Sequence, residues 1–476
     1  MTRRSNRRDF LKQTAFAGAG FWVAGTAAAD KTRSANDKLN VAVIGAGGQG
    51  LANLARVALT ENVVALCDVD EARAGKAFGA FPKAKKYHDF RKMLDEMDKQ
   101  IDAVTVTTPD NTHAVISIMA MKMGKHVYCQ KPLTHTVYEA RLMRETARKH
   151  KVATQMGNQG TAESGLRRAV EIIQAGVLGP VTEAHVWTNR PIWAQGADAV
   201  LRIPAAREAA YAAMHGKAAG SPQLLQPPPH VHWDLFLGTA PWRPYAGPGV
   251  HHPFAWRGWW DFGTGALGDM GCHTANMAFM ALKLGHPTSI VAERVHDLNP
   301  ETYPTGARVA FQFPARDGMA PVKLTWYEGI DQDRVKYLPP AYLFHGHKPV
   351  ASGSLLVGEK GILYSPNDYG ATYLFLGKDA RDIEAEAKKV DKRLPRNGLG
   401  DIGMKIEWLQ AIRNGKPETA LSNFDYAAML TETILLGDVA MRAGHTVEWN
   451  GPEMKITNIP DANKYLRTEY RKGWEL

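Results

Sequence analysis

The chain has 476 residues, a formal net charge of +10 and an ordinary globular composition, in which 45% of the residues are hydrophobic. This length predicts two or three domains, and the composition excludes wholesale disorder. The positive charge is spread along the chain and forms no basic run, so no nucleic-acid partner is expected, and three cysteines are too few for a disulfide framework.

Residues 1–29 have the three parts of a signal peptide: a basic start, an apolar middle and a small-residue cleavage site. The run Arg7-Arg8-Asp9-Phe10-Leu11-Lys12 resembles the twin-arginine export signal. It predicts a periplasmic or exported protein whose partner is the twin-arginine translocation machinery; an ordinary secretion signal or an uncleaved anchor are the alternatives. The apolar middle is too short and too rich in glycine and alanine for a stable membrane anchor.

Residues 37–160 alternate apolar strands with helices, which predicts a Rossmann domain with a parallel sheet covered on both faces. The predicted strands are residues 39–44, 63–67, 103–107, 126–129 and 152–156. The predicted helices are residues 51–59, 90–97, 114–123 and 137–150.

The first strand ends in a glycine-rich turn that opens a helix, and Asp68 follows at the end of the next strand. Such a turn lets the backbone approach a pyrophosphate, although glycine turns can also be purely structural. Asp68 would bind the adenosine ribose hydroxyls and would repel a 2′-phosphate, which favours NAD(H) over NADP(H); Arg73 nearby weakens that preference. The predicted contacts in the turn are Gly45, Gly47, Gly48, Gln49 and Gly50.

Two later loops also follow strands, where ligands bind in open α/β sheets. In the first, the predicted cofactor contacts are Thr108, Pro109, Asn111 and His113, with a helix-capping or packing role left open for the histidine. In the second, Gln130 and Lys131 precede Pro132, which biases Lys131 toward an extended turn. A lysine beside a positively charged nicotinamide could exchange a proton with a hydroxyl; a surface lysine at a turn is the alternative. Asn158 is a further predicted cofactor contact.

Residues 161–455 predict a second, α+β domain. Alternation of apolar and polar residues over 309–313 and 322–327 predicts a half-buried antiparallel sheet with one open face. A hairpin turn is predicted at 358–361. Predicted helices occupy residues 166–174, 406–412 and 426–441, and residues 456–476 form a charged and aromatic C-terminal arm that could wrap another domain or subunit.

An insert at 190–260 shows little periodicity and is rich in aromatic, histidine and arginine residues, as expected of a functional segment. Some of these side chains should line a substrate cleft, while others pack the sheet. The histidines are not accompanied by a spaced set of His, Cys and carboxylate ligands, so no metal site is predicted. The side chains in question are Arg190, Trp193, His230, His232, Trp233, Tyr245, His251, His252, Arg257, Trp259 and Trp260.

Asp269 and His273 follow a glycine-rich segment and are four residues apart. If Gly268 opens a helix, the two side chains share one face and could orient a substrate hydroxyl and pass its proton. The alternative is an aspartate that caps the helix and a histidine packed beneath it. Cys129 and Cys272 lie beside these predicted site residues, but a catalytic thiol is not favoured.

In order, the glycine turn, Thr108-Pro109-x-x-x-His113, Lys131-Pro132 and Asp269-x-x-x-His273 resemble the Gfo/Idh/MocA oxidoreductases over residues 39 to about 450. The resemblance implies a Rossmann domain and an open-faced, mainly antiparallel sheet domain with the active site between them. It implies that Lys131 and His273 handle protons, that Asp269 binds substrate, and that the substrates are carbohydrates or polyols. One position departs from the family pattern, because Gln130 replaces the usual glutamate.

The favoured function is an exported NAD-dependent oxidoreductase that acts on a sugar, polyol or glycoside with a tightly held cofactor, because free nicotinamide is not recycled outside the cytoplasm. A redox-neutral glycoside hydrolase is the second candidate: transient oxidation acidifies a neighbouring C–H, the aglycone leaves, water adds and the hydride returns. A non-catalytic NAD-bound sugar-binding protein is the third. A homo-oligomer, either a dimer or a tetramer, is also expected.

Overall fold

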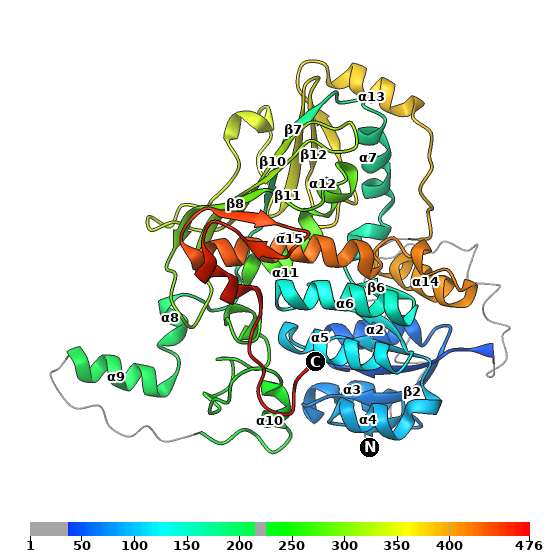
Figure 1. Cartoon of the computed structure of the whole chain (residues 1–476), viewed down its shortest axis with the longest axis vertical. Helices are drawn as coiled ribbons and strands as arrows, with labels where there is room; N and C mark the ends of the chain where they lie inside the picture. The colour runs from blue at the N-terminus through cyan, green and yellow to red at the C-terminus, as the bar shows by residue number, and fades with distance from the viewer. Residues whose placement is uncertain (1–36, 215–224, 399) are drawn as a thin grey trace, which may run out of the picture.

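The N-terminal domain is a parallel sheet with helices on both faces (Figure 1). The computed structural model describes residues 37–214, 225–398 and 400–476. The strands follow the order β3-β2-β1-β4-β5-β6 and every pair is parallel, which confirms the predicted Rossmann fold. The strands are β1 (Asn40–Ile44), β2 (Asn62–Cys67), β3 (Lys85–Tyr87), β4 (Ala103–Val106), β5 (His126–Cys129) and β6 (Thr154–Met156). The helices are α2 (Gln49–Val57), α3 (Glu71–Ala80), α4 (Phe90–Met97), α5 (Asp110–Lys122) and α6 (Val137–His150).

Helix α3 and strand β3 were not predicted from the sequence. Two glycines, Gly75 and Gly79, lower the helix propensity of α3, while the Asp70 side chain caps its first turn by accepting from the Arg73 amide at 3.0 Å. Strand β3 has only three residues and two of them are exposed lysines, so its sequence carries no apolar run. The predicted signal peptide at 1–29 lies outside the described residues.

The C-terminal domain contains a nine-stranded sheet in the order β13-β12-β11-β7-β10-β9-β8-β14-β15. Strands β7 and β10 pair in parallel and the other pairs are antiparallel, which confirms the predicted mainly antiparallel sheet. The predicted hairpin turn connects β11 to β12. The strands are β7 (Val181–Trp187), β8 (Ser289–His296), β9 (Gly306–Phe313), β10 (Val322–Gly329), β11 (Gly353–Gly358), β12 (Ile362–Ser365), β13 (Leu374–Leu376), β14 (Val447–Asn450) and β15 (Lys455–Ile456).

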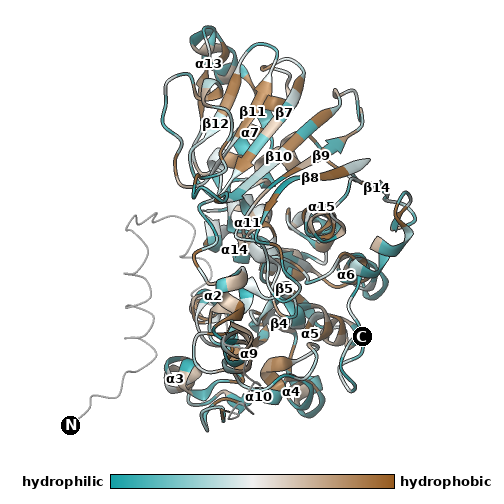
Figure 2. Ribbon diagram, turned by 90° about the vertical axis from the view of Figure 1, so that its left-hand side faces the viewer, coloured by the Kyte–Doolittle hydropathy of each residue, from teal (hydrophilic) through white to brown (hydrophobic). Residues whose placement is uncertain are grey.

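Helices α11, α12 and α15 cover one face of this sheet, and α15 lies between the sheet and helix α6 of the Rossmann domain (Figures 1 and 2). On the other face, the short helical turn Ala341–Phe344 packs Phe344 against Trp187, with ring centroids 5.4 Å apart, so this face is partly covered. The helices of this domain are α7 (Ser164–Gln174), α11 (Gly265–Thr274), α12 (Asn276–Ala281), α13 (Ala380–Lys389), α14 (Gly400–Asn414) and α15 (Phe424–Ala443).

The insert at 190–260 folds back onto the Rossmann domain. It contains α8 (Ala197–Val200), α9 (Pro204–Met214) and α10 (Trp233–Leu237). Val231 forms an antiparallel bridge with Asp70 after β2, and the His232 amide donates to the Val69 carbonyl at 2.9 Å. Its aromatic residues build a separate apolar cluster, which explains a segment rich in tryptophan but without periodicity. In the described residues, none of the helices has the length and apolarity needed to cross a membrane.

The C-terminal arm runs from the sheet domain to the Rossmann domain (Figure 1). After the turn Pro460–Leu466, Trp474 packs against Phe90 and lies 4.3 Å from the Arg91 guanidinium. Arg471 forms an ion pair with Asp234 of α10. The arm therefore fastens the insert and the Rossmann domain to each other.

Candidate active site

A cavity of about 420 Å³ lies at the carboxyl edge of the parallel sheet. Its size is within the range of small-molecule and cofactor sites. Its floor comes from the predicted glycine turn and the two predicted loops, and its cover comes from the insert and the arm. The lining residues include Gly45, Gly47, Gly48, Gln49, Asp68, Thr108, Pro109, His113, Gln130, Lys131, His252, Trp256, Arg257 and Trp474.

The glycine turn has the shape that a dinucleotide requires. Gly45 has φ +78°, and a side chain there would collide with the Thr107 carbonyl. A side chain on Gly50 would collide with the Gly45 carbonyl. Helix α2 begins at Gln49 with no side-chain cap, and the Gly50 and Leu51 amides donate to the Gly47 and Gly48 carbonyls. The positive end of the helix therefore lies at the glycine turn, where it favours an anion. These features fit a bound pyrophosphate.

Asp68 stands at the end of β2 and is held by two backbone amides. Its Oδ2 accepts from Gly47 and its Oδ1 accepts from Asp70, each at 2.9 Å. Burial raises the pKa of Asp68 above its ordinary value despite these bonds. The carboxylate is thus oriented into the cavity beside the turn, where a ribose hydroxyl would share it.

His113 connects the two loops that border the cavity. Its Nδ1 lies 2.9 Å from the Pro132 carbonyl and its Nε2 lies 2.9 Å from the Thr108 carbonyl. Burial alone would lower the pKa of His113, but Cys129 and the two carbonyl acceptors raise it. Helix α5 begins at Asp110 and not at residue 114, so this histidine lies on a helix. Its contacts with two backbone carbonyls agree with the packing role that was left open for it.

Three predicted cofactor contacts do not line the cavity. Asn111 donates to the Leu237 carbonyl at 3.0 Å and so anchors the insert. Asn158 donates to the Cys272 carbonyl at 3.3 Å and accepts from the Ser422 hydroxyl at 2.6 Å. Gly50 is also set back from the cavity, because it packs against Gly45 within the turn. These three residues therefore stabilise the backbone around the cavity without lining it.

Lys131 and Asp269 meet across the boundary between the domains. The Lys131 Nζ lies 2.8 Å from Asp269 Oδ1 and 2.7 Å from the Asp269 carbonyl. Arg257 of the insert donates to the same Oδ1 at 3.2 Å. Burial alone would raise the pKa of Asp269, but Lys131 and Arg257 hold it well below the ordinary value. An ionised carboxylate that does not itself line the cavity therefore holds two cations that do.

His273 shares a face of α11 with Asp269, as predicted, although the helix begins at Gly265 and not at Gly268. Its ring packs edge-on against Tyr369, with centroids 4.8 Å apart. Burial lowers its pKa well below the ordinary value, so the imidazole is neutral at pH 7. Its buried Nδ1 has no hydrogen-bond partner in the described part of the chain, which leaves it for a ligand atom or a water.

Asp110 is a site residue that the sequence analysis missed. It lines the cavity, is almost fully buried and accepts from the Thr264 hydroxyl at 2.7 Å. Burial raises its pKa to about 7, even though Arg257 and Lys131 oppose that shift. No motif distinguishes Asp110, because aspartate is common in the first turn of a helix for its interaction with the helix dipole alone.

Gln130, which replaces the glutamate of the family pattern, lines the cavity and donates to Asn53 Oδ1 at 3.3 Å. The same oxygen accepts from the buried Lys405 Nζ at 2.7 Å. Burial lowers the pKa of Lys405, which Asp401 opposes through an ion pair. A neutral side chain at 130 is thus linked through one amide to a buried lysine.

The three cysteines are buried and unpaired. Burial raises the pKa of Cys272 to about 12 and that of Cys67 well above its ordinary value. Cys272 and Cys67 are therefore protonated at neutral pH and are poor nucleophiles.

Two family models match the chain. The Gfo/Idh/MocA oxidoreductase family model for an NAD-binding Rossmann fold matches residues 39–158, and the model for its C-terminal alpha/beta domain matches residues 212–301. Over these two segments the chain is similar to this family. Its N-terminal domain is accordingly an NAD-binding Rossmann domain.

Sequence relatives match part of the chain. Inositol 2-dehydrogenase of Salmonella typhimurium is 30% identical over 152 residues, which are 31% of this chain and 45% of the relative. A glycosyl hydrolase family 109 protein of Solibacter usitatus is 27% identical over 210 residues, which are 40% of this chain and 47% of the relative. The chain thus spans less than half the length of these relatives.

A solved structure extends the comparison to both domains. The WlbA dehydrogenase from Chromobacterium violaceum, in complex with NADH and UDP-GlcNAcA, superposes with a TM-score of 0.55 and 16% identity. The match covers 87% of this chain and 96% of the dehydrogenase. At this identity the likeness concerns the fold.

Proposed function

We propose that the protein is an exported, NAD-dependent oxidoreductase that acts on a sugar, polyol or glycoside and keeps its cofactor bound. The observation that carries the proposal is that Asp269 holds Lys131 and Arg257, which line the same cavity as the glycine turn. NAD, when bound there, supplies the hydride acceptor. The named specificity of the inositol 2-dehydrogenase relative supports a polyhydroxylated substrate.

Lys131 is the proposed group that takes the proton of the reacting hydroxyl. In the structure its ammonium is held by Asp269, so in the reducing direction it can donate a proton to a carbonyl oxygen. In the oxidising direction the same side chain would accept the proton of the reacting hydroxyl. His273, neutral and with an unpartnered Nδ1, would hold a neighbouring hydroxyl and assist the transfer.

Lys131→Met tests this assignment. The variant should retain NAD but lose catalysis by about 10²- to 10⁴-fold, because its side chain cannot exchange a proton. The measurement is the single-turnover change in nicotinamide absorbance with a panel of sugars and polyols. Lys360→Met, on the exposed β11–β12 turn, is the matched control and should behave as the wild type. Unchanged turnover in Lys131→Met would contradict this assignment, whereas no turnover in the wild type would favour a non-catalytic, NAD-bound sugar-binding protein.

A redox-neutral glycoside hydrolase is the second candidate, and the glycosyl hydrolase family 109 relative favours it. Both activities begin with the same removal of a hydride and a proton. Product masses distinguish them when cofactor-loaded protein is incubated with glycosides and no added nicotinamide. Products lighter by two hydrogens support the oxidoreductase, whereas many turnovers to free sugar and aglycone support the hydrolase.

Export is proposed on the twin-arginine motif at residues 7–12. A protein that leaves the cytoplasm folded can carry its cofactor with it, which agrees with a cavity covered by the insert and the arm. Replacement of Arg7 and Arg8 by Lys should leave the protein in the cytoplasm of a host with a twin-arginine pathway. Normal export of that variant would contradict the proposal.

A further inference from the structure

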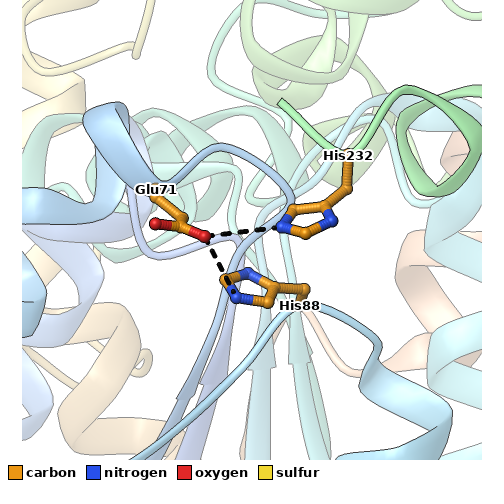
Figure 3. A group of neighbouring side chains, drawn as sticks. All are labelled: Glu71, His88 and His232. Atoms are coloured by element: carbon orange, nitrogen blue, oxygen red, sulfur yellow. Dashed lines mark ion pairs between the residues drawn. The ribbon is translucent and has the colours of Figure 1, made fainter. Parts of the chain in front are cut away.

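Glu71, His88 and His232 come together although they belong to three separate segments of the chain (Figure 3), and His88 also lines the cofactor cavity. Glu71 opens helix α3, His88 follows strand β3, and His232 belongs to the insert. Each offers one ligand atom, and the three atoms lie within 4.8 Å of one another. The sequence could not predict this cluster, because its members share no motif spacing.

The two separations between the carboxylate and the imidazoles suit a small, tetrahedral cation. Glu71 Oε1 lies 3.4 Å from His88 Nε2 and 3.6 Å from His232 Nε2. Two ligands that are each about 2.0–2.1 Å from a tetrahedral zinc ion lie about 3.3 Å apart. Both separations exceed the usual length of a hydrogen bond to a carboxylate, so small side-chain rotations toward a common ion would fit better than direct pairing.

The histidines present the correct nitrogens. His88 Nδ1 lies 3.1 Å from the Asp68 carbonyl, which can only accept, so the proton resides on Nδ1 and the Nε2 lone pair faces Glu71. A carbonyl that orients the ring in this way is the usual outer partner of a metal-binding histidine. The His232 Nε2 is buried and has no hydrogen-bond partner among the described residues. The two rings stack with centroids 4.1 Å apart.

We propose that Glu71, His88 and His232 bind one divalent transition-metal ion, with zinc as the best match, and that this ion fastens the insert over the adenosine half of the cofactor. Two imidazoles and one carboxylate are typical zinc ligands, and water completes the coordination. Zinc binds here independently of the proposed sugar chemistry.

The surrounding backbone explains the fastening. The Glu71 amide donates to the His230 carbonyl at 3.0 Å, so the insert already pairs with the first turn of α3. His252, further along the insert, lies 3.0 Å from Asp70 Oδ2. His88 and His252 both line the cofactor cavity. An ion that ties His232 to Glu71 and His88 would therefore hold the cover against the wall of the cavity.

Zinc binding by the tag-free mature protein tests the site. After treatment with EDTA, the protein is titrated with zinc chloride by calorimetry, and its metal content is measured by mass spectrometry. One zinc ion per chain should bind, and excess zinc should raise the melting temperature by about 3 °C or more. His232→Ala and Glu71→Gln should each weaken binding by about tenfold or more. His230→Ala, which removes a neighbouring exposed histidine outside the cluster, is the matched control and should bind as the wild type.

Absence of zinc binding, or equal binding by all three variants, would overturn the site. Release of NAD from the zinc-loaded and EDTA-treated proteins tests the fastening role separately. Zinc should slow release by about fivefold or more in the wild type, and by much less in His232→Ala. Equal release rates in a protein that does bind zinc would overturn the fastening role alone, and neither result depends on sugar oxidation.

Discussion

Asp110 is a carboxyl group buried beside two cations and a second carboxylate, and its protonation state follows the pH of the solution. Burial raises its pKa to about 7 from the ordinary value of 3.8. The folded chain therefore binds this proton more tightly than the unfolded chain does. The resulting contribution to stability is fully present below about pH 4 and is lost as the pH rises through 7.

Asp110→Asn removes this dependence while keeping an oxygen that can accept from Thr264. We expect the variant to gain stability relative to the wild type as the pH rises from 5 to 8, because the wild type must ionise a buried acid. A shift of about three units corresponds to at most about 4 kcal/mol. Urea unfolding at both pH values measures the difference. A difference that is the same at pH 5 and pH 8 would show that Asp110 is ionised throughout.

At the scale of single elements, the turn before α2 requires a glycine at position 50, where the backbone packs directly against the Gly45 carbonyl. Gly50→Ala should abolish retention of NAD, because the new methyl group would overlap the Gly45 carbonyl and displace the turn. The measurement is the NAD content of the purified protein. Gly79→Ala is the matched control, since nothing lies within 4 Å of a methyl group there and the helix should gain about 0.5–1 kcal/mol. Equal NAD content in both variants would contradict this account.

The C-terminal arm closes the cavity with Trp474. Trp474→Ala should accelerate NAD release, because the indole packs on Phe90 and Arg91 as part of the cavity wall. Stopped-flow or fluorescence measurement of nicotinamide release would record the change. Trp242→Ala removes a tryptophan that is 66% exposed and should leave the release rate unaltered. If the two variants release NAD at the same rate, the arm does not retain the cofactor.

For the whole molecule, the sheet domain presents a face that is only partly covered. Along β8–β10 this face carries charged side chains, with Glu293 paired to both Arg308 and Lys323. The sequence-based expectation of a dimer or tetramer stays a prediction. Light scattering of the eluting protein should give two or four times the mass of the mature chain, and a monomer across micromolar concentrations would contradict it.

The strands of the two sheets were easier to predict from the sequence than the insert at 190–260. Alternation of strands and helices located β1, β2, β4, β5 and β6, because a parallel sheet buried on both faces needs uninterrupted apolar runs. Period-two alternation located β9 and β10, because an antiparallel sheet with one exposed face buries only every second side chain. The insert has no such period, since its aromatic residues pack on the Rossmann domain through an irregular backbone.

The same reasoning explains which site residues could be predicted. Lys131 and Asp269 were predicted from the order of the motifs along the chain. The structure places the Lys131 Nζ 2.8 Å from Asp269 Oδ1. Arg257, Asp110 and Thr264 join them through tertiary contacts that no local spacing encodes. Asn111 and Asn158 lie close to the site in sequence order but turn their amides toward backbone carbonyls behind it.

The Lys131–Asp269 ion pair joins side chains 138 positions apart, from a loop of the Rossmann domain and a helix of the sheet domain. Lys131, which is proposed to exchange the substrate proton, therefore also connects the two domains. The same contact therefore serves both the proposed chemistry and the docking of the two domains on each other.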